Sequence, residues 1–368
     1  MRKIGIFTFW DVPNYGTFMQ AYALQQIIAK NYPEDKVVQI SYLNRHHYKA
    51  YYSTINTNYF LFFINPRFYR DLCHRWQRRA NIKSLKAFLS YYDSIPHTVN
   101  FEREKLKKAS FDIVVLGSDI IWDYRQGIFG NDRFLFGNDF HAGRVIAYAP
   151  SFGTVKSSDE PPSYVVEGLN GLAAISVRDE NSAKLVKQYT GKEVPVVLDP
   201  TLLMDADDEN FVKPNIKNYI IVYGSSFSSE LIHGARKYAN QHHLKLVCLD
   251  SLDDTFDWCD LNISQENLSP FSWCGYFKYA EAVFTCTYHG LMFGLIFKKR
   301  LIFHPTPFIL DKASSLIDYL GLREVLVEEK SFEGKMDWTW DYEEIDRRLL
   351  PMKEKSLMYL KESLKING

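Results

Sequence analysis

Residues able to bind anions or move protons follow several short apolar runs in this sequence. In the stretch 111–122, FDIVVLGSDIIW, the apolar run Ile113–Leu116 breaks at Gly117–Asp119, and Arg178 and His289 each follow a similar run. A carboxylate can activate a hydroxyl, and an imidazole can donate or accept a proton near neutral pH. A guanidinium binds carboxylate or phosphate through paired hydrogen bonds. These residue types together favour acid–base chemistry on an anionic substrate.

The same pattern recurs along the chain. Six apolar runs each end in a polar or glycine-containing turn: 4–9, 111–116, 144–149, 173–177, 194–198 and 282–286. Continuous apolar runs are typical of strands buried on both faces of a parallel sheet. One such turn is equally compatible with a simple helix cap. Ligands of open α/β sheets bind beyond the carboxyl ends of the strands, so six such turns predict a cleft lined by strand ends.

Strands alternate with helices in both halves, which predicts an α/β fold of two Rossmann-like domains facing a cleft. The pattern breaks at about 203–217 and restarts with the strand 219–224. We expect an N-terminal domain over 1–205, with a helical insertion at about 45–110. We expect a C-terminal domain over 215–335 and a final helix within 340–368 that returns toward the first domain.

Composition describes a globular protein with balanced charge. Apolar residues make up 46% of the 368 residues, and Lys+Arg and Asp+Glu number 44 each, so the global charge predicts no nucleic-acid partner. No run approaches the roughly 18 apolar residues of a spanning helix. The start, Met1-Arg2-Lys3, leads directly into a strand and not into an apolar leader. We therefore expect a cytoplasmic protein.

Cysteine and histidine spacing predicts no metal site. The five cysteines form no Cys-x-x-Cys pair, which favours free thiols in a reducing compartment. The pairs His46-His47 and His242-His243 are adjacent in sequence, and adjacent side chains do not share one face of a helix or strand.

The segment 45–86 is basic and aromatic. It has nine Lys or Arg residues and one acid, interleaved with Tyr, Phe and Trp. This mixture suits peripheral contact with an anionic membrane surface or a lipid-linked acceptor. It is also compatible with a helical subdomain whose aromatic side chains pack inward while its arginines face water. Nucleic acid is the weakest of the three interpretations.

Six motifs in order resemble the polysaccharide pyruvyl transferase family. They are Asn14-Tyr15-Gly16 with Gln20–Leu24, Gly117–Trp122, Ser151-Phe152-Gly153, Ser176–Asp179, Asp199–Leu203 and Thr287–Gly290. The resemblance extends from about residue 3 to about 322. Two positions depart from the family pattern: Tyr288 stands where Phe is usual, and Lys298-Lys299-Arg300 replaces a stretch with Asn-Lys-Pro. These departures suggest a different acceptor.

The resemblance implies a GT-B-like fold and transfer of pyruvate from phosphoenolpyruvate to a saccharide, as a ketal, with release of phosphate. The acceptor would be a polysaccharide or its lipid-linked precursor, and phosphoenolpyruvate is the donor substrate with no further cofactor. Two other functions remain open. One is a nucleotide-sugar glycosyltransferase of the same fold, and the other is a non-catalytic relative that binds glycan or lipid.

The expected catalytic residues are His289 and Asp119. His289 would donate to the leaving phosphate or accept a hydroxyl proton, and Asp119 would stabilise positive character at C2 or activate the attacking hydroxyl, with Asp199 as the alternative. Arg178 would bind an anion, and Lys312 is a weaker candidate for the phosphate. Trp122 would stack on a sugar or fill the core. The expected substrate-binding residues are Asn14, Tyr15, Gly16, Gly117, Ser118, Trp122, Ser151, Arg178, Thr287, Gly290 and Lys312.

Overall fold

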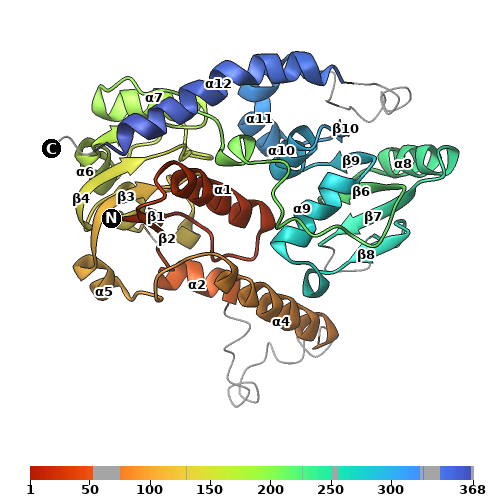
Figure 1. Ribbon diagram of the computed structural model, residues 1–368, viewed down its shortest axis with the longest axis horizontal. Coiled ribbons are helices and arrows are strands. Elements are labelled where there is room, and N and C mark those ends of the chain that lie inside the picture. The colour runs from red at the N-terminus through yellow and green to blue at the C-terminus, as the bar shows by residue number, and fades with distance from the viewer. Residues whose placement is uncertain are drawn as a thin grey trace.

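Two parallel sheets of five strands each form the molecule, which confirms the expected fold class (Figure 1). The computed structural model describes residues 1–52, 75–129, 131–225, 227–250, 256–323, 326 and 340–365, with the backbone alone for 75–81. The first sheet, in the order β2-β1-β3-β4-β5, contains β1 (Lys3–Phe7), β2 (Lys36–Gln39), β3 (Ser110–Leu116), β4 (His141–Ala147) and β5 (Ala174–Ile175). The second, in the order β10-β9-β6-β7-β8, contains β6 (Tyr219–Tyr223), β7 (Lys245–Leu249), β8 (Leu261–Ile263), β9 (Ala282–Thr285) and β10 (Arg300–Phe303).

The central strands are apolar because helices cover both faces of each sheet. Ile6 in β1 pairs with Gln39 on one side and Val115 on the other, and all strand neighbours are parallel. One expectation was wrong: 194–198 forms no strand and meets Val177 through a single bridge at Val196. Pro195 has no N–H to donate to a sheet ladder, so pairing does not extend along this segment.

The helices of the described residues alternate with these strands. They are α1 (Tyr15–Asn31), α2 (Arg45–Tyr52), α4 (Arg75–Ser90), α5 (Arg103–Lys108), α6 (Ser163–Gly171), α7 (Glu180–Thr190), α8 (Ser229–Gln241), α9 (Pro270–Tyr279), α10 (Tyr288–Ile296), α11 (Pro307–Leu320) and α12 (Tyr342–Ser363). Among the described residues, none of these helices has the length and apolar character needed to cross a bilayer.

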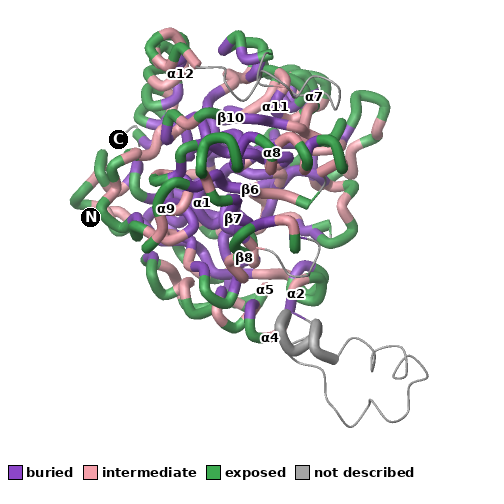
Figure 2. The backbone as a smooth tube through the Cα atoms, turned by 90° about the vertical axis from the view of Figure 1, so that its right-hand side faces the viewer, coloured by how far each residue is buried: buried purple, intermediate pink, exposed green. Residues whose placement is uncertain are grey.

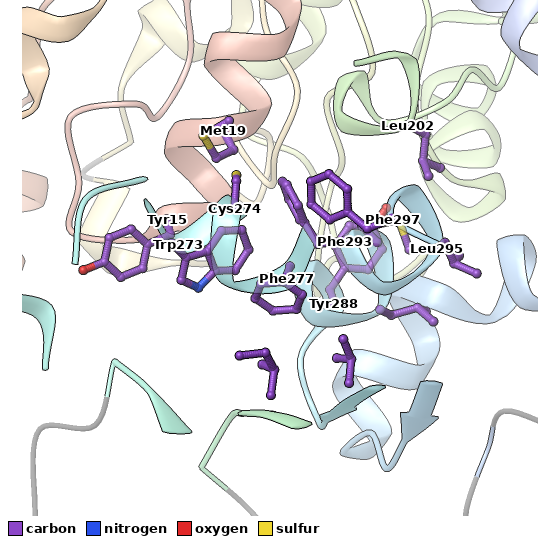
Figure 3. Packing of buried hydrophobic residues seen from close by; sticks show 14 of the residues in the cluster. Tyr15, Met19, Leu202, Trp273, Cys274, Phe277, Tyr288, Phe293, Leu295 and Phe297 are labelled. Atoms are coloured by element: carbon purple, nitrogen blue, oxygen red, sulfur yellow. The ribbon is translucent and has the colours of Figure 1, made fainter. Parts of the chain in front are cut away.

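Helix α1 lies between the first sheet and the second domain, and this position explains why it is buried around most of its circumference. Tyr15 at its start stacks on Trp273 of α9, with ring centroids 5.9 Å apart. The Tyr15 hydroxyl donates to the carbonyl of Leu268 at 2.9 Å. Figure 3 shows Tyr15 and Met19 beside Trp273, in a hydrophobic core that both domains share. Burial is concentrated toward the centre of the molecule, around β6 and β7 (Figure 2).

Helix α12 crosses over both domains (Figure 1). Its first half packs Ile345 and Leu349 into the shared core, and its second half packs Leu360 against the first sheet. Near its end, the Tyr359 hydroxyl donates to the carbonyl of Ala147 at 2.8 Å. This helix therefore ties the two domains together in the arrangement that creates the cleft between them.

The insertion after β2 also reaches the second domain. Helix α4 lies beside the short 3₁₀ helix Gln265–Asn267, and its Phe88 is fully buried against Tyr15 and Phe18. The backbone of 75–81 is helical, but most of the basic and aromatic side chains on which the membrane hypothesis rests lie outside the described residues.

Candidate active site between the two domains

A cleft of about 450 Å³ lies between the domains and is lined from both sides. The first domain contributes Asp119, which follows β3, and Arg178, which follows β5. The second domain contributes His289 from the start of α10 and Lys312 from α11. Each of these side chains comes from a different element, so the cleft is assembled only when the two domains are in contact.

Ion pairs and hydrogen bonds hold the wall that the first domain contributes. The Arg178 guanidinium lies 2.9 Å from Asp199 Oδ2 and 3.8 Å from Asp119 Oδ1, and only 5% of its side chain is exposed. The Thr17 hydroxyl donates to Asp119 Oδ2 at 2.9 Å. Asp199 also accepts from the Thr201 hydroxyl at 2.8 Å. The charged groups of this wall are therefore fixed in position before any ligand binds.

Asp119 has a backbone φ of +85°, a left-handed conformation that side chains other than glycine adopt at a cost. Burial opposes ionisation of Asp119, but Arg178, the other basic groups of the cleft and the hydrogen bond from the Ile120 N–H together outweigh it and hold the pKa of Asp119 below its usual value. Burial likewise opposes the charge of Arg178, and Tyr288, Asp199 and Asp119 outweigh it, so the pKa of Arg178 is raised. Both groups are charged at neutral pH, and the strained turn directs the carboxylate into the cleft.

His289 is positioned by two neighbours, one in each domain. Thr287 caps α10 by accepting from the Gly290 N–H at 3.0 Å, and the imidazole packs on Gly16 of α1. A Cβ placed at Gly16 would lie 2.1 Å from His289 Cγ, so only glycine fits there. His289 Nε2 is buried and has no hydrogen-bond partner among the residues that the structure describes. Burial lowers the pKa of His289 despite the nearby Asp199 and Asp119, so the ring is neutral at pH 7 and available to accept a proton.

Lys312 faces the same cleft from α11. Its ammonium lies 4.1 Å from the ring centroid of Phe308, and within the described residues it makes no hydrogen bond or ion pair. Burial and the charge of Arg178 lower the pKa of Lys312 to about 8. The second domain thus presents two titratable groups, His289 and Lys312, without fixed polar partners.

Aromatic side chains of the first domain also line the cleft. Phe9, His47, Tyr51 and Phe129 line it together, and the Phe9 ring centroid lies 4.5 Å from that of His47 and 4.6 Å from that of Phe129. Burial lowers the pKa of His47 to about 4, so this side chain is neutral at pH 7. The surface can therefore pack against an apolar sugar face, but it cannot bind a phosphate by charge.

The structure brings some of the expected site residues together and places others behind them. Six line the cleft: Asn14, Asp119, Arg178, Thr287, His289 and Lys312. Seven do not line it: Tyr15, Gly16, Gly117, Ser118, Trp122, Ser151 and Gly290. Tyr15 anchors the second domain, and Gly16 makes room for His289. Trp122 is fully buried and its indole N–H donates to the carbonyl of Leu135 at 2.8 Å, so it fills the core and not a sugar site.

The four other residues that lie behind the cleft have supporting contacts. Ser118 Oγ donates to Asp199 Oδ2 at 3.4 Å, and Gly117 packs directly on Thr8. Ser151 Oγ accepts from the Gly153 N–H at 3.1 Å, and the Gly290 N–H is used by the Thr287 cap. These residues shape the turns that carry the cleft residues.

The sequence reasoning missed His47, Tyr51, Tyr223 and Phe308, which all line the cleft. Tyr223 ends β6, and the strand-end argument could have found it. His47 and Tyr51 belong to the insertion, whose position over the cleft no local pattern indicates. Within the described residues, no group of three or more His, Cys, Asp or Glu side chains is placed to hold a metal ion.

The two facing parallel sheets, with a cleft at their strand ends and a last helix that crosses both, define a two-domain protein of GT-B-like architecture. The model of the polysaccharide pyruvyl transferase family matches residues 14–303, so the chain belongs to this family of transferases. No curated protein matches the sequence.

Solved structures similar to this chain include the UDP-GlcNAc 2-epimerase from Methanocaldococcus jannaschii. It is 11% identical, with a TM-score of 0.47, over 96% of this chain and 93% of that one. The glycosyltransferase SnogD from Streptomyces nogalater is 10% identical, with a TM-score of 0.41, over 99% of this chain and all of the other (100%).

Proposed function

We propose that this protein transfers pyruvate from phosphoenolpyruvate to a saccharide, forms a ketal across two hydroxyls and releases phosphate. The observation that carries the proposal is that one interdomain cleft holds both a fixed, buried guanidinium, Arg178, and a His289 Nε2 that has no hydrogen-bond partner in the described residues. A donor with a carboxylate and a phosphate needs positive groups, and Arg178 and Lys312 provide them. A sugar hydroxyl needs a base, and neutral His289 provides one.

The roles follow from the protonation states. Arg178 would bind an anionic group of the donor through the guanidinium donors that Asp199 does not occupy. His289 would accept the proton of the attacking hydroxyl, and would later return it to the departing phosphate. Ionised Asp119 would stabilise the positive character that develops at C2. The aromatic surface formed by Phe9, His47, Tyr51 and Phe129 would hold the acceptor sugar.

The acceptor would be a polysaccharide unit or its lipid-linked precursor. The basic segment 45–86 would then bring the protein to an anionic membrane surface, where each exposed Lys or Arg contributes about 1 kcal/mol. Cosedimentation with anionic and with neutral vesicles at low and high salt tests this part on its own. Salt-sensitive binding to anionic vesicles alone supports it, and equal partition to both kinds contradicts it.

A phosphate-release assay tests the main proposal. The purified protein is incubated with phosphoenolpyruvate and a panel of lipid-linked oligosaccharides, free oligosaccharides and nucleotide sugars. We expect phosphate release with at least one acceptor, and mass spectrometry should show that acceptor heavier by one pyruvate ketal. Release of a nucleoside diphosphate from a nucleotide sugar, without phosphate release from phosphoenolpyruvate, would instead identify a glycosyltransferase.

A further inference from the structure

Lys312 lines two cavities at once. It faces the interdomain cleft, and it also lines a second cavity of about 310 Å³ that Tyr319 and Met352 help to enclose. Arg178 and Tyr288 are the other residues common to both cavities, so these three side chains form the partition between them. The amine at this partition is half-buried and lies beside Arg178, which lines the same two cavities.

Among the residues that the structure describes, no carboxylate is in contact with the Lys312 ammonium. The charged or titratable groups that act on it from the neighbouring elements are Arg178, Asp119, Asp123, Asp179 and His289. Asp119 and Asp179 already serve other partners, because Asp119 accepts from Thr17 and Asp179 accepts from the Ser182 N–H at 2.7 Å. Asp123 likewise accepts from the Thr154 hydroxyl at 2.7 Å. None of these carboxylates lies within 4.0 Å of Lys312 Nζ as an ion pair.

We propose that Lys312 is the proton donor to the methylene carbon, C3, of the bound enol donor. This inference rests on the proposed function and adds the acid that the function requires. Addition of a hydroxyl to C2 moves the C2–C3 π pair onto C3, and that pair needs a proton. Asp119 is ionised and His289 is neutral, so neither carries a proton suited to this step, whereas the lowered pKa of Lys312, about 8, keeps an ammonium that can release one.

The complete reaction balances with the residues present. In the first half, the sugar oxygen bonds to C2, the hydroxyl proton goes to His289, and the Lys312 ammonium gives a proton to C3, which becomes a methyl group. In the second half, the C2–O bond to phosphate breaks and the phosphate leaves with the proton from His289. The second sugar hydroxyl bonds to C2 and gives its proton to the neutral amine of Lys312. Both side chains return to their starting states.

The test separates proton transfer from simple binding. Isothermal titration with phosphoenolpyruvate gives the Kd of the wild type, Lys312→Met and Lys312→Arg, and phosphate release with the acceptor found above gives turnover. We expect Lys312→Met to lower turnover at least roughly 100-fold, the usual range for loss of a general acid, while its Kd rises less than about tenfold. We expect the wild-type rate to fall above pH 8, and we expect Lys312→Arg to bind phosphoenolpyruvate but to turn over as slowly as Lys312→Met, since a guanidinium keeps its charge and does not release its proton.

Lys355→Met is the matched control, because Lys355 lines only the second cavity and is exposed. It should keep wild-type turnover. Wild-type turnover in Lys312→Met, or a Kd raised by more than tenfold with kcat unchanged, would overturn the proton-donor role and leave the proposed function standing. Failure of the wild-type protein to bind phosphoenolpyruvate or to release phosphate would remove the proposed function, and this inference with it.

Discussion

The two walls of the cleft differ in how their charged groups are held. On the first domain, Arg178, Asp199 and Asp119 form a closed set of ion pairs and hydrogen bonds. On the second domain, His289 Nε2 and the Lys312 ammonium have no polar partner within the described residues. Satisfied buried charges are positioned before a ligand binds, whereas unsatisfied ones are available to a ligand or to a proton. We therefore infer that the first wall binds the donor and that the second wall takes part in the reaction.

The largest effect on stability and turnover should come from replacing Arg178, which forms the ion pairs of the first wall. Arg178→Met leaves Asp199 and Asp119 buried without their cation, so we expect the free energy of unfolding to fall by about 3–5 kcal/mol. Turnover should fall at least roughly 100-fold as well. Urea unfolding measures the first effect and phosphate release the second. Arg125→Met is the control, since the Arg125 pair with Asp159 is partly exposed and should contribute little to stability.

Loss of His289 from the second wall should lower turnover strongly but change the free energy of unfolding little. His289→Gln removes the base, so turnover should fall at least roughly 100-fold. The free energy of unfolding should change by less than about 1 kcal/mol, because His289 Nε2 makes no hydrogen bond within the described part of the chain. A variant that unfolds as readily as Arg178→Met would show that His289 is a structural residue and would remove the contrast between the walls.

Gly16→Ala tests the contact that joins the two walls. The added methyl group would meet the His289 ring at 2.1 Å, so the ring or the second domain must shift. We expect the free energy of unfolding to fall by about 1–3 kcal/mol, together with loss of turnover. Gly171→Ala, in α6, has open space around the new methyl and should be neutral or stabilising by about 0.4–1 kcal/mol. Equal behaviour of the two variants would contradict the packing of His289 on Gly16.

The smallest effect concerns the pH dependence of stability through Lys312. The pKa of Lys312 is about 8 in the folded protein, whereas its ordinary value is 10.5. Between these two pH values the unfolded chain therefore binds more protons than the folded protein does. Wild-type stability therefore rises with pH in this window relative to Lys312→Met. We expect Lys312→Met to be the more stable protein at pH 7, and the difference to shrink by pH 9.5. Urea unfolding at both pH values checks this, and a constant difference would show that Lys312 titrates normally.

The sequence was sufficient to predict the wall residues that follow strands. Asp119, Arg178 and His289 each come after an apolar run, and the carboxyl ends of parallel strands meet at one edge of a sheet. Tyr15 and Gly16 were expected to touch substrate, but they contact the second domain instead. Their motif alone could not show this, because their partners, Leu268 and His289, lie more than 250 residues away. Local patterns carry no information on such distant packing.

The insertion shows the same limit. His47 lies in α2, outside the strand–helix alternation, and only the packing of α2 over the strand ends brings its ring to Phe9. The strand expected at 194–198 failed for a local reason, since Pro195 cannot donate to a ladder. The alternation of strands and helices in the sequence therefore predicts where the cleft lies. Which side chains face the cleft depends on tertiary packing, which the sequence pattern does not show.

The central claim is that Arg178 binds the donor while His289 acts in the reaction. Titration of phosphoenolpyruvate into the wild type, Arg178→Lys and His289→Gln tests this claim most directly. Lysine keeps the charge of Arg178 but cannot reproduce its planar array of donors, so Arg178→Lys should weaken binding at least about tenfold. His289→Gln should bind within about threefold of the wild type, because the second wall acts in the reaction more than in binding. Two results would contradict these roles of Arg178 and His289. One is that the wild type does not bind phosphoenolpyruvate. The other is that Arg178→Lys binds it as well as the wild type does while His289→Gln loses binding.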